Sequence, residues 1–306
     1  MPCLTHIIDK DFTQTLRLDR YVSEYLKILT RSQIKTRKLT AKINGKDVKI
    51  SRIVKQGDQL DLNWNESQPI DIIPQELPLD IVYEDERCAV INKIQGMVVH
   101  PGAGNRQGTL ANALYFRRLN KGNSSSNMRA GIVHRLDKET SGIIITAYDD
   151  EANTFLADQF KNRKVKKKYI AIVCGIPKEQ KGCIETSMAR DQKDRKRFAV
   201  SASGKNAVTF FKVIESWCNH SLVILFPRTG RTHQLRVHMR HIGCPILGDP
   251  VYGSKDSLFP DASLMLHSKS LMITLPGKEK ESVFTSDMPQ RFEICIEKLR
   301  RIHQHG

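Results

Sequence analysis

The sequence has no long apolar run and no paired-cysteine motif. No stretch approaches the roughly 20 apolar residues that cross a bilayer, and its start (MPCLTHIIDKDF) carries no basic-then-apolar leader pattern. The 7 cysteines are scattered and none forms a CxxC pair, which argues against a disulfide framework and a structural zinc site. These absences predict a cytoplasmic protein with reduced thiols, no membrane segment and no metal centre.

Nucleotide-binding motifs are missing as well. Residues 101–108 (PGAGNRQG) do not form a GxGxxG, and no Gly-Lys-Ser/Thr follows a glycine run. A protein-kinase catalytic loop would read His-Arg-Asp, whereas a leucine intervenes in residues 134–137 (HRLD). We therefore expect no nucleotide and no other small-molecule cofactor.

Positive charge is abundant. Lys and Arg number 49 against 33 Asp and Glu, a formal net charge of +16 in 306 residues. Such an excess favours a polyanionic partner, most often nucleic acid, although a solvated basic surface without a partner has the same composition. The apolar fraction of 40% allows a sizeable core in one large or two unequal domains.

The N-terminal region reads as a small basic domain over residues 13–67. Apolar residues recur with a helical period in 15–29, and a second short helix is expected over 32–40. Strands are expected over 41–49 and 58–64, with Asn44-Gly45 as a hairpin turn. Three prolines then mark a linker over 68–78, followed by a large domain over 79–300.

The large domain alternates strand pairs with single helices. We expect strands in 81–93, 167–175, 207–215 and 221–227, helices at 109–119, 152–163 and 231–242, and a polar loop at 121–129. This order predicts an α+β fold with a mixed, mainly antiparallel sheet.

The strongest chemical signal is the segment GIVHRLDKETSG at residues 131–142. Asp137 lies between Arg135 and Lys138, and apolar residues flank the charged turn on both sides. A carboxylate held on such a turn can face a cleft as a nucleophile or base, and nearby cations favour its ionised form. On the residues alone, a structural salt bridge fits equally well.

Two resemblances sharpen this interpretation. The segment RLDRYV, Arg31-Ser32, Ile43-Asn44-Gly45 and GDQLDL resemble the S4 RNA-binding domain, although an accessory folding domain with a basic face remains an alternative. The large domain resembles the RluA family of pseudouridine synthases through HRLDKETSG, VKKKYIAIVCG, RTGRTHQLRVHMRHIGCPILGDPVYG, the strands and loop opening at LDIVYEDERCAVINK, and the closing SLMLHSKSLMITLPG. These matches follow the family's order. They are closest to its RluD subgroup, which acts on large-subunit ribosomal RNA.

The RluA resemblance implies a role for each matching residue. Asp137 corresponds to the catalytic aspartate, Tyr169 to the tyrosine that packs on the flipped uracil, and Arg236 to the basic residue that pairs with the aspartate. The substrate- or RNA-binding candidates are Arg135, which would enter the RNA stack, Leu235 as an apolar wall, His134, and on the S4-like domain Arg31, Lys35 and Lys38. We expect His134 to pack and hydrogen-bond rather than titrate.

Other features have weaker interpretations. His233, His238 and His241 crowd one segment, but no acidic or cysteine partner supports a metal site there. Two basic runs, 161–168 and 190–197, favour phosphate contacts over a merely solvated face. Residues 186–190 (TSMAR) depart from the Pro-Ile-Arg pattern common in the family, which bears on the choice of RNA.

The chemistry agrees with these roles. Pseudouridine formation converts one isomer into another, so it requires no redox cofactor; it requires a carboxylate at the ribose and a uridine outside its helix. We expect a monomeric RNA pseudouridine synthase acting on large-subunit (23S) ribosomal RNA, with the helix 69 stem-loop as first candidate. The alternatives are a synthase for another large-subunit site, a synthase for transfer RNA, a non-catalytic RNA-binding ribosome-assembly factor, and a glycosidase, which normally needs two carboxylates.

Overall fold

The protein consists of two compact units. The computed structural model describes residues 2–9, 11–65, 72–102, 104–120, 131–194 and 197–305, and it divides the chain into residues 1–71 and 72–306. The expected polar loop at 121–129 and the first part of the expected linker lie outside the described residues. No described helix is long and apolar enough to span a membrane.

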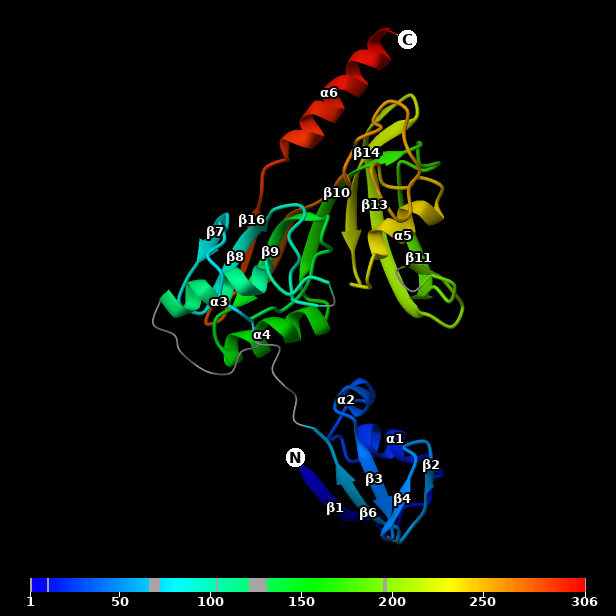
Figure 1. Ribbon diagram of the computed structural model, residues 1–306. Coiled ribbons are helices and arrows are strands. Elements are labelled where there is room, and N and C mark those ends of the chain that lie inside the picture. The colour runs from blue at the N-terminus through cyan, green and yellow to red at the C-terminus, as the bar shows by residue number, and fades with distance from the viewer. Residues whose placement is uncertain are drawn as a thin grey trace. The chain divides into compact units, whose positions relative to one another are not determined.

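The small unit is a sheet with short helical segments around its own core (Figure 1). Its four-stranded antiparallel sheet has the order β1-β6-β3-β4, from β1 (Cys3–Ile7), β3 (Thr40–Ile43), β4 (Lys46–Val48) and β6 (Gln59–Asn63). A second strand pair and three helical segments complete it: β2 (Leu16–Arg17), β5 (Ile53–Val54), α1 (Leu18–Arg20), the π-helix η1 (Tyr21–Tyr25) and α2 (Arg31–Thr36).

The expected helices of this unit are shorter in the structure. The first covers only residues 18–25 of the expected 15–29, since residues 16–17 pair with β5 and Lys27 has a φ of 55° that no right-handed helix accepts. The second begins after a capping box made by Thr30 and Gln33 and ends at Thr36. The Asn44-Gly45 hairpin is confirmed, with positive φ at both residues.

The large unit is organised around one 10-stranded sheet with the order β12-β11-β13-β14-β10-β15-β9-β8-β7, to which β16 adds beside β15. The strands are β7 (Ile81–Glu84), β8 (Cys88–Lys93), β9 (Ser141–Ala147), β10 (Lys166–Cys174), β11 (Lys181–Arg190), β12 (Phe198–Val200), β13 (Lys205–Trp217), β14 (His220–Pro227), β15 (Leu266–Thr274) and β16 (Glu281–Thr285). Only β9 and β15 are paired in parallel among these described strands. The expected α+β fold with a mainly antiparallel sheet is confirmed.

Helices cover both faces of this sheet. They are α3 (Leu110–Asn120), α4 (Asp150–Lys161), α5 (Gln234–His241) and α6 (Gln290–His305). In Figure 1, α3 and α4 accompany β7, β8 and β9, whereas α5 lies beside β11 and β13. Alternate residues of β9 enter different cores, because Ile144 packs in the cluster containing Leu110 of α3 and Ile145 packs with Leu156 of α4.

A glycine fixes the two strands next to the charged turn. Gly142 has a φ of 107°, and a Cβ there would lie 2.3 Å from the backbone oxygen of Ser268, so only glycine allows β9 to approach β15 this closely. Residues 72–75, which lie within the expected linker, pack on α3. Ile72 packs with Ala111, and the side-chain amide of Asn112 donates to the Ile73 carbonyl.

Candidate active site

Asp137 lies on a loop that hydrogen bonds hold on two sides. The Thr140 amide donates to the Asp137 carbonyl, and the Ala147 amide of β9 donates to the Gly131 carbonyl. The buried Lys93 ammonium donates to the carbonyls of Ile94, Met97 and Lys138. These bonds fix the turn whose side chain carries the predicted catalytic carboxylate.

Arg236 joins Asp137 to a second carboxylate. It enters from α5, and its Nη1 lies 3.4 Å from Asp137 Oδ2. Its Nε and Nη2 donate to the two oxygens of Asp249 at 2.7 Å each. The exposed side-chain fractions are 5% for Arg236, 0% for Asp249 and 19% for Asp137. Arg236 is therefore fixed by Asp249, and its remaining nitrogen faces Asp137, the partner expected from the sequence.

In the pair of Arg236 and Asp249, charge pairing and hydrogen bonds outweigh the effect of burial on the pKa values. Burial alone would raise the pKa of Asp249, but the Arg236 guanidinium and the backbone amides of Tyr252 and Val251 hold it below its usual value. Burial would likewise lower the pKa of Arg236, and the carboxylates of Asp249 and Asp137 raise it. Both groups therefore remain ionised around neutral pH.

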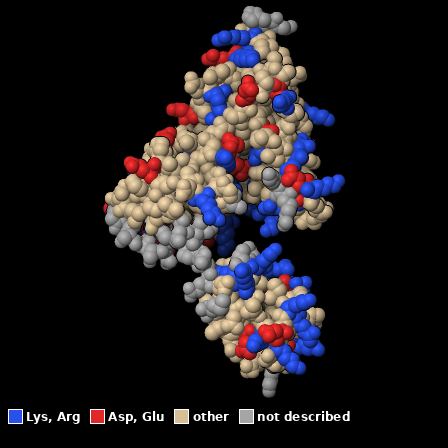
Figure 2. Space-filling model, in the orientation of Figure 1, with Lys and Arg blue, Asp and Glu red and all other residues tan. Residues whose placement is uncertain are grey.

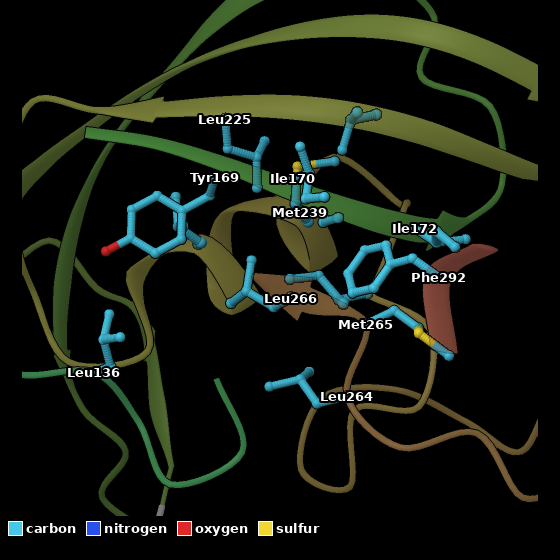
Figure 3. Packing of buried hydrophobic residues seen from close by; sticks show 14 of the residues in the cluster. Leu136, Tyr169, Ile170, Ile172, Leu225, Met239, Leu264, Met265, Leu266 and Phe292 are labelled. Atoms are coloured by element: carbon cyan, nitrogen blue, oxygen red, sulfur yellow. The ribbon is translucent and has the colours of Figure 1, made fainter. Parts of the chain in front are cut away.

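Tyr169 and Lys167 reach the site from one face of β10. They are two residues apart, and an irregularity in the pairing of β10 with β15 falls between Lys168 and Tyr169. Figure 3 shows the Tyr169 ring at the edge of the apolar cluster, with its hydroxyl directed away from Leu266 and Phe292. Burial raises the pKa of Tyr169 to about 12 and lowers that of Lys167 to about 8.

These groups line a cavity of about 540 Å³. It brings together all six candidates of the large unit, namely His134, Arg135, Asp137, Tyr169, Leu235 and Arg236. Among the lining residues that the structure describes, Asp137 is the only acidic one, whereas 7 are Lys or Arg (Arg135, Lys161, Arg163, Lys167, Arg228, Arg231 and Arg236). One carboxylate among many cations suits a polyanionic ligand that reacts at that carboxylate.

The remaining candidates occupy different positions. His134 stacks on Phe160 and accepts a hydrogen bond from the Ile145 amide, and burial lowers its pKa to about 3, so it packs without titrating near neutrality. Arg31, Lys35 and Lys38 are exposed on the small unit. Figure 2 shows Lys and Arg side chains gathered along one side of that unit.

One group of side chains has metal-ligand chemistry. Donor atoms of Cys174, His220 and Asp256 lie within 4.8 Å of one another. His220 Nε2 is hydrogen-bonded to Asp256, and its Nδ1 is buried without a partner among the described residues. A metal on Nε2 would move the ring proton to Nδ1, where nothing accepts it, so the geometry favours the hydrogen-bonded pair.

Three residues of the site were not singled out from the sequence. Asp249 and Tyr252 belong to the GDPVYG stretch, and His233 was considered only as a metal ligand. Tyr252 lies 5.1 Å below the Arg236 guanidinium and is hydrogen-bonded to His233. The available signal was their place inside the segment matched to the family, but their roles depend on contacts with Asp137 and Arg236 that spacing alone does not reveal.

Comparison with known proteins gives consistent matches. A family model described as RNA pseudouridylate synthase matches residues 87–241. The ribosomal large subunit pseudouridine synthase D of Borreliella burgdorferi is 42% identical over 301 residues, covering 94% of this chain and 92% of that protein. Its namesake in Pseudomonas aeruginosa is 37% identical, covering 93% and 92%. The solved structure of human RNA pseudouridylate synthase domain containing 4 is 26% identical with a TM-score of 0.58, covering 72% of this chain and 93% of that one.

Proposed function

The chain belongs to the family of RNA pseudouridylate synthases, and from that membership we propose that it isomerises uridines of large-subunit ribosomal RNA with Asp137 as the reacting carboxylate. The observation that carries this proposal is the position of Asp137 as the sole acid among the described residues of a cation-lined cavity, beside Tyr169. A phosphate backbone fits the cations, and a single acid suffices for an isomerisation.

The reaction breaks the C1′–N1 bond of a uridine, turns the base and joins C1′ to C5; C5 releases its proton and N1 takes one up, so the product is an isomer of the substrate. Asp137 acts at the ribose as nucleophile or base, and Arg236, whose Nη1 lies 3.4 Å from it, is the nearest cation described at that carboxylate. The Tyr169 ring offers a face for the uracil, because it lies at the apolar edge of the cavity. The base must leave its helix to reach this site, and exposed Arg135 can occupy the vacated space.

Three observations support ribosomal RNA as the substrate. Relatives from Borreliella burgdorferi and Pseudomonas aeruginosa, matched along nearly their whole length, are named as large-subunit ribosomal enzymes. The basic small unit, which we propose to be an S4-like domain, adds exposed cations for flanking RNA. A loop uridine costs less to flip than a paired one, which favours a stem-loop such as helix 69. We propose a cytoplasmic monomer, as expected from the sequence.

The test uses C5-tritiated RNA and two matched variants. Asp137→Asn removes the charge with little change in volume, and Asp261→Asn makes the same change at an exposed position away from the cavity. We expect Asp137→Asn to release no tritium while its RNA affinity stays within about threefold of wild type, and Asp261→Asn to behave as wild type. Turnover by Asp137→Asn within about tenfold of wild type would remove Asp137 from this role.

Mapping of the products decides the substrate. The protein is incubated separately with large-subunit RNA, transfer RNA and a helix 69 transcript, and modified positions are read by carbodiimide primer extension. Modification confined to transfer RNA would overturn the ribosomal assignment and leave the isomerase activity in place. RNA binding without modification of any of the three would favour the non-catalytic alternative.

A further inference from the structure

His233 lies against the reacting carboxylate. It is the residue before α5, and its backbone has the left-handed conformation, with φ 57° and ψ 16°. That conformation is uncommon for residues other than glycine, although asparagine, aspartate and histidine adopt it more often than the rest, and such positions cluster at functional sites. It places Nε2 of the ring 3.8 Å from Asp137 Oδ2, on the same oxygen that faces Arg236.

Tyr252 determines which ring nitrogen of His233 carries the proton. The Phe198 backbone amide donates to the Tyr252 hydroxyl at 2.8 Å, and the hydroxyl lies 2.9 Å from His233 Nδ1. The Phe198 amide is a donor and cannot accept the hydroxyl proton, so Nδ1 is the acceptor available to that proton within the described chain, and we assign the hydroxyl as donor to Nδ1. The neutral ring then carries its proton on Nε2, facing Asp137.

Burial agrees with a neutral ring. Desolvation lowers the pKa of His233 below its usual value, and the nearby Arg236 and Arg135 act in the same direction against the carboxylates of Asp137 and Asp249. The ring is also held by edge-on contacts with Tyr252 and Phe198, whose centroids lie 5.5 Å and 5.9 Å from its own.

Tyr252 also contacts the end of the basic run at 190–197. Phe198 opens β12 directly after that run, and its amide is the donor to Tyr252. The guanidinium of Arg197 also lies 5.5 Å from the centre of the Tyr252 ring. The C-terminal end of this basic run is thus connected to Asp137 through the side chains of Tyr252 and His233.

We propose that His233 is a positioning residue that donates a hydrogen bond from Nε2 to Asp137, and that Tyr252 links this contact to Arg197 and Phe198, where the basic run 190–197 ends and β12 begins. The proposal rests on the role of Asp137 proposed above. Arg236 is committed to Asp249 and reaches Asp137 only at 3.4 Å, so it leaves the rotation of that carboxylate underdetermined. A second donor would fix it. Nε2 lies 3.8 Å from Asp137 Oδ2, which is too long for a hydrogen bond, and under this proposal the distance closes to bonding length when RNA occupies the cavity.

Asparagine and glutamine at position 233 test the contributions of the two ring nitrogens separately. His233→Asn tolerates the left-handed backbone and keeps a polar group near the Nδ1 position, but it has nothing at Nε2. His233→Gln extends an amide N–H to the Nε2 position. Tyr252→Phe keeps the aromatic ring and removes the hydroxyl. Each variant is measured for single-turnover tritium release, RNA dissociation constant and melting temperature.

We expect His233→Asn to lower the single-turnover rate by about tenfold or more with RNA affinity unchanged, as loss of a hydrogen bond to a charged group predicts. His233→Gln should recover most of the rate. Tyr252→Phe should also slow turnover. The double variant of His233→Asn and Tyr252→Phe should be no slower than the slower of these two single variants, because both changes act on one chain of contacts.

Three results would overturn the proposal: a His233→Asn rate within about twofold of wild type, equal losses in His233→Asn and His233→Gln, or additive losses in the double variant. If His233→Asn does not fold, the comparison of His233→Gln with Tyr252→Phe decides, because only the second should be slow. Asp137→Asn keeps the two proposals apart. Its continued turnover would refute the role of Asp137, whereas its inactivity beside unaffected His233 variants would refute the positioning role alone.

Discussion

Replacing Asp249 with asparagine tests whether the Arg236 clamp organises the site. The side chain is fully buried, its two oxygens accept from Arg236 at 2.7 Å each, and one of them also accepts from the amides of Val251 and Tyr252. Asparagine keeps the shape and one acceptor oxygen. It removes the charge and places an amide N–H₂ against either the guanidinium or the two backbone donors.

The expected cost follows from burial. Removing one partner of a buried ion pair leaves the other charge uncompensated, which destabilises a protein by about 3 to 5 kcal/mol. For a unit of this size, each kcal/mol lowers the melting temperature by roughly 2–4 °C, so we expect a fall of about 6 °C or more. Arg236 would then move toward Asp137, its remaining partner at 3.4 Å, and a displacement near 1 Å would cost about 100-fold in turnover.

Two assays on the full chain check this. Differential scanning calorimetry follows the transition of the large unit, and tritium release at saturating RNA follows turnover at a temperature where the variant is folded. Asp261→Asn serves as the matched control because that residue is exposed. The reasoning fails if Asp249→Asn melts within about 2 °C of wild type or keeps turnover within about threefold of it.

Two further predictions concern RNA binding. Because burial lowers the pKa of Lys167 to about 8 and a phosphate favours the charged amine, RNA affinity should fall from about pH 7 to about pH 9, and less so in Lys167→Arg, which stays charged; equal pH slopes measured by filter binding would contradict this. Changing Arg31, Lys35 and Lys38 together to alanine should weaken binding and reduce the slope of log Kd against log salt by up to about 3, with turnover at saturating RNA unchanged. A slope equal to that of wild type would remove these residues from the RNA interface.

The candidates that the structure brings into one cavity are those where chemistry and local pattern coincide. Asp137 stands in a charged turn between apolar segments, and Tyr169 follows a basic run at the start of an apolar strand; these patterns made both residues candidates, and the family resemblance implied their roles. Asp249 carried no comparable signal. Its importance comes from the Arg236 side chain 13 positions earlier in the chain, and only the folded turn brings the two together.

Local propensity was least reliable in the small unit. The helical period of residues 15–29 is real, yet β2 captures Leu16 and Arg17 by pairing with β5, and the chain turns at Lys27. Short elements gain more from tertiary pairing than from helix propensity, so such boundaries shift by several residues. The longer elements that were expected in the large unit lie within a few residues of their expected positions, whereas β11, β15 and α6 were not expected from the sequence.

The seven cations of the cavity fall into two groups by their partners, and under the function proposed above these groups serve RNA binding and the reacting carboxylate separately. Arg236 is held by Asp249, so its charge is already compensated and Asp137 receives only its outer nitrogen. The other six lining cations form no ion pair with a described carboxylate, which leaves them available to phosphates. If Arg236 lacked Asp249, it would pair fully with Asp137 and mask it. If Asp137 reacts as proposed, a buried structural ion pair thus keeps the carboxylate beside it available to the substrate.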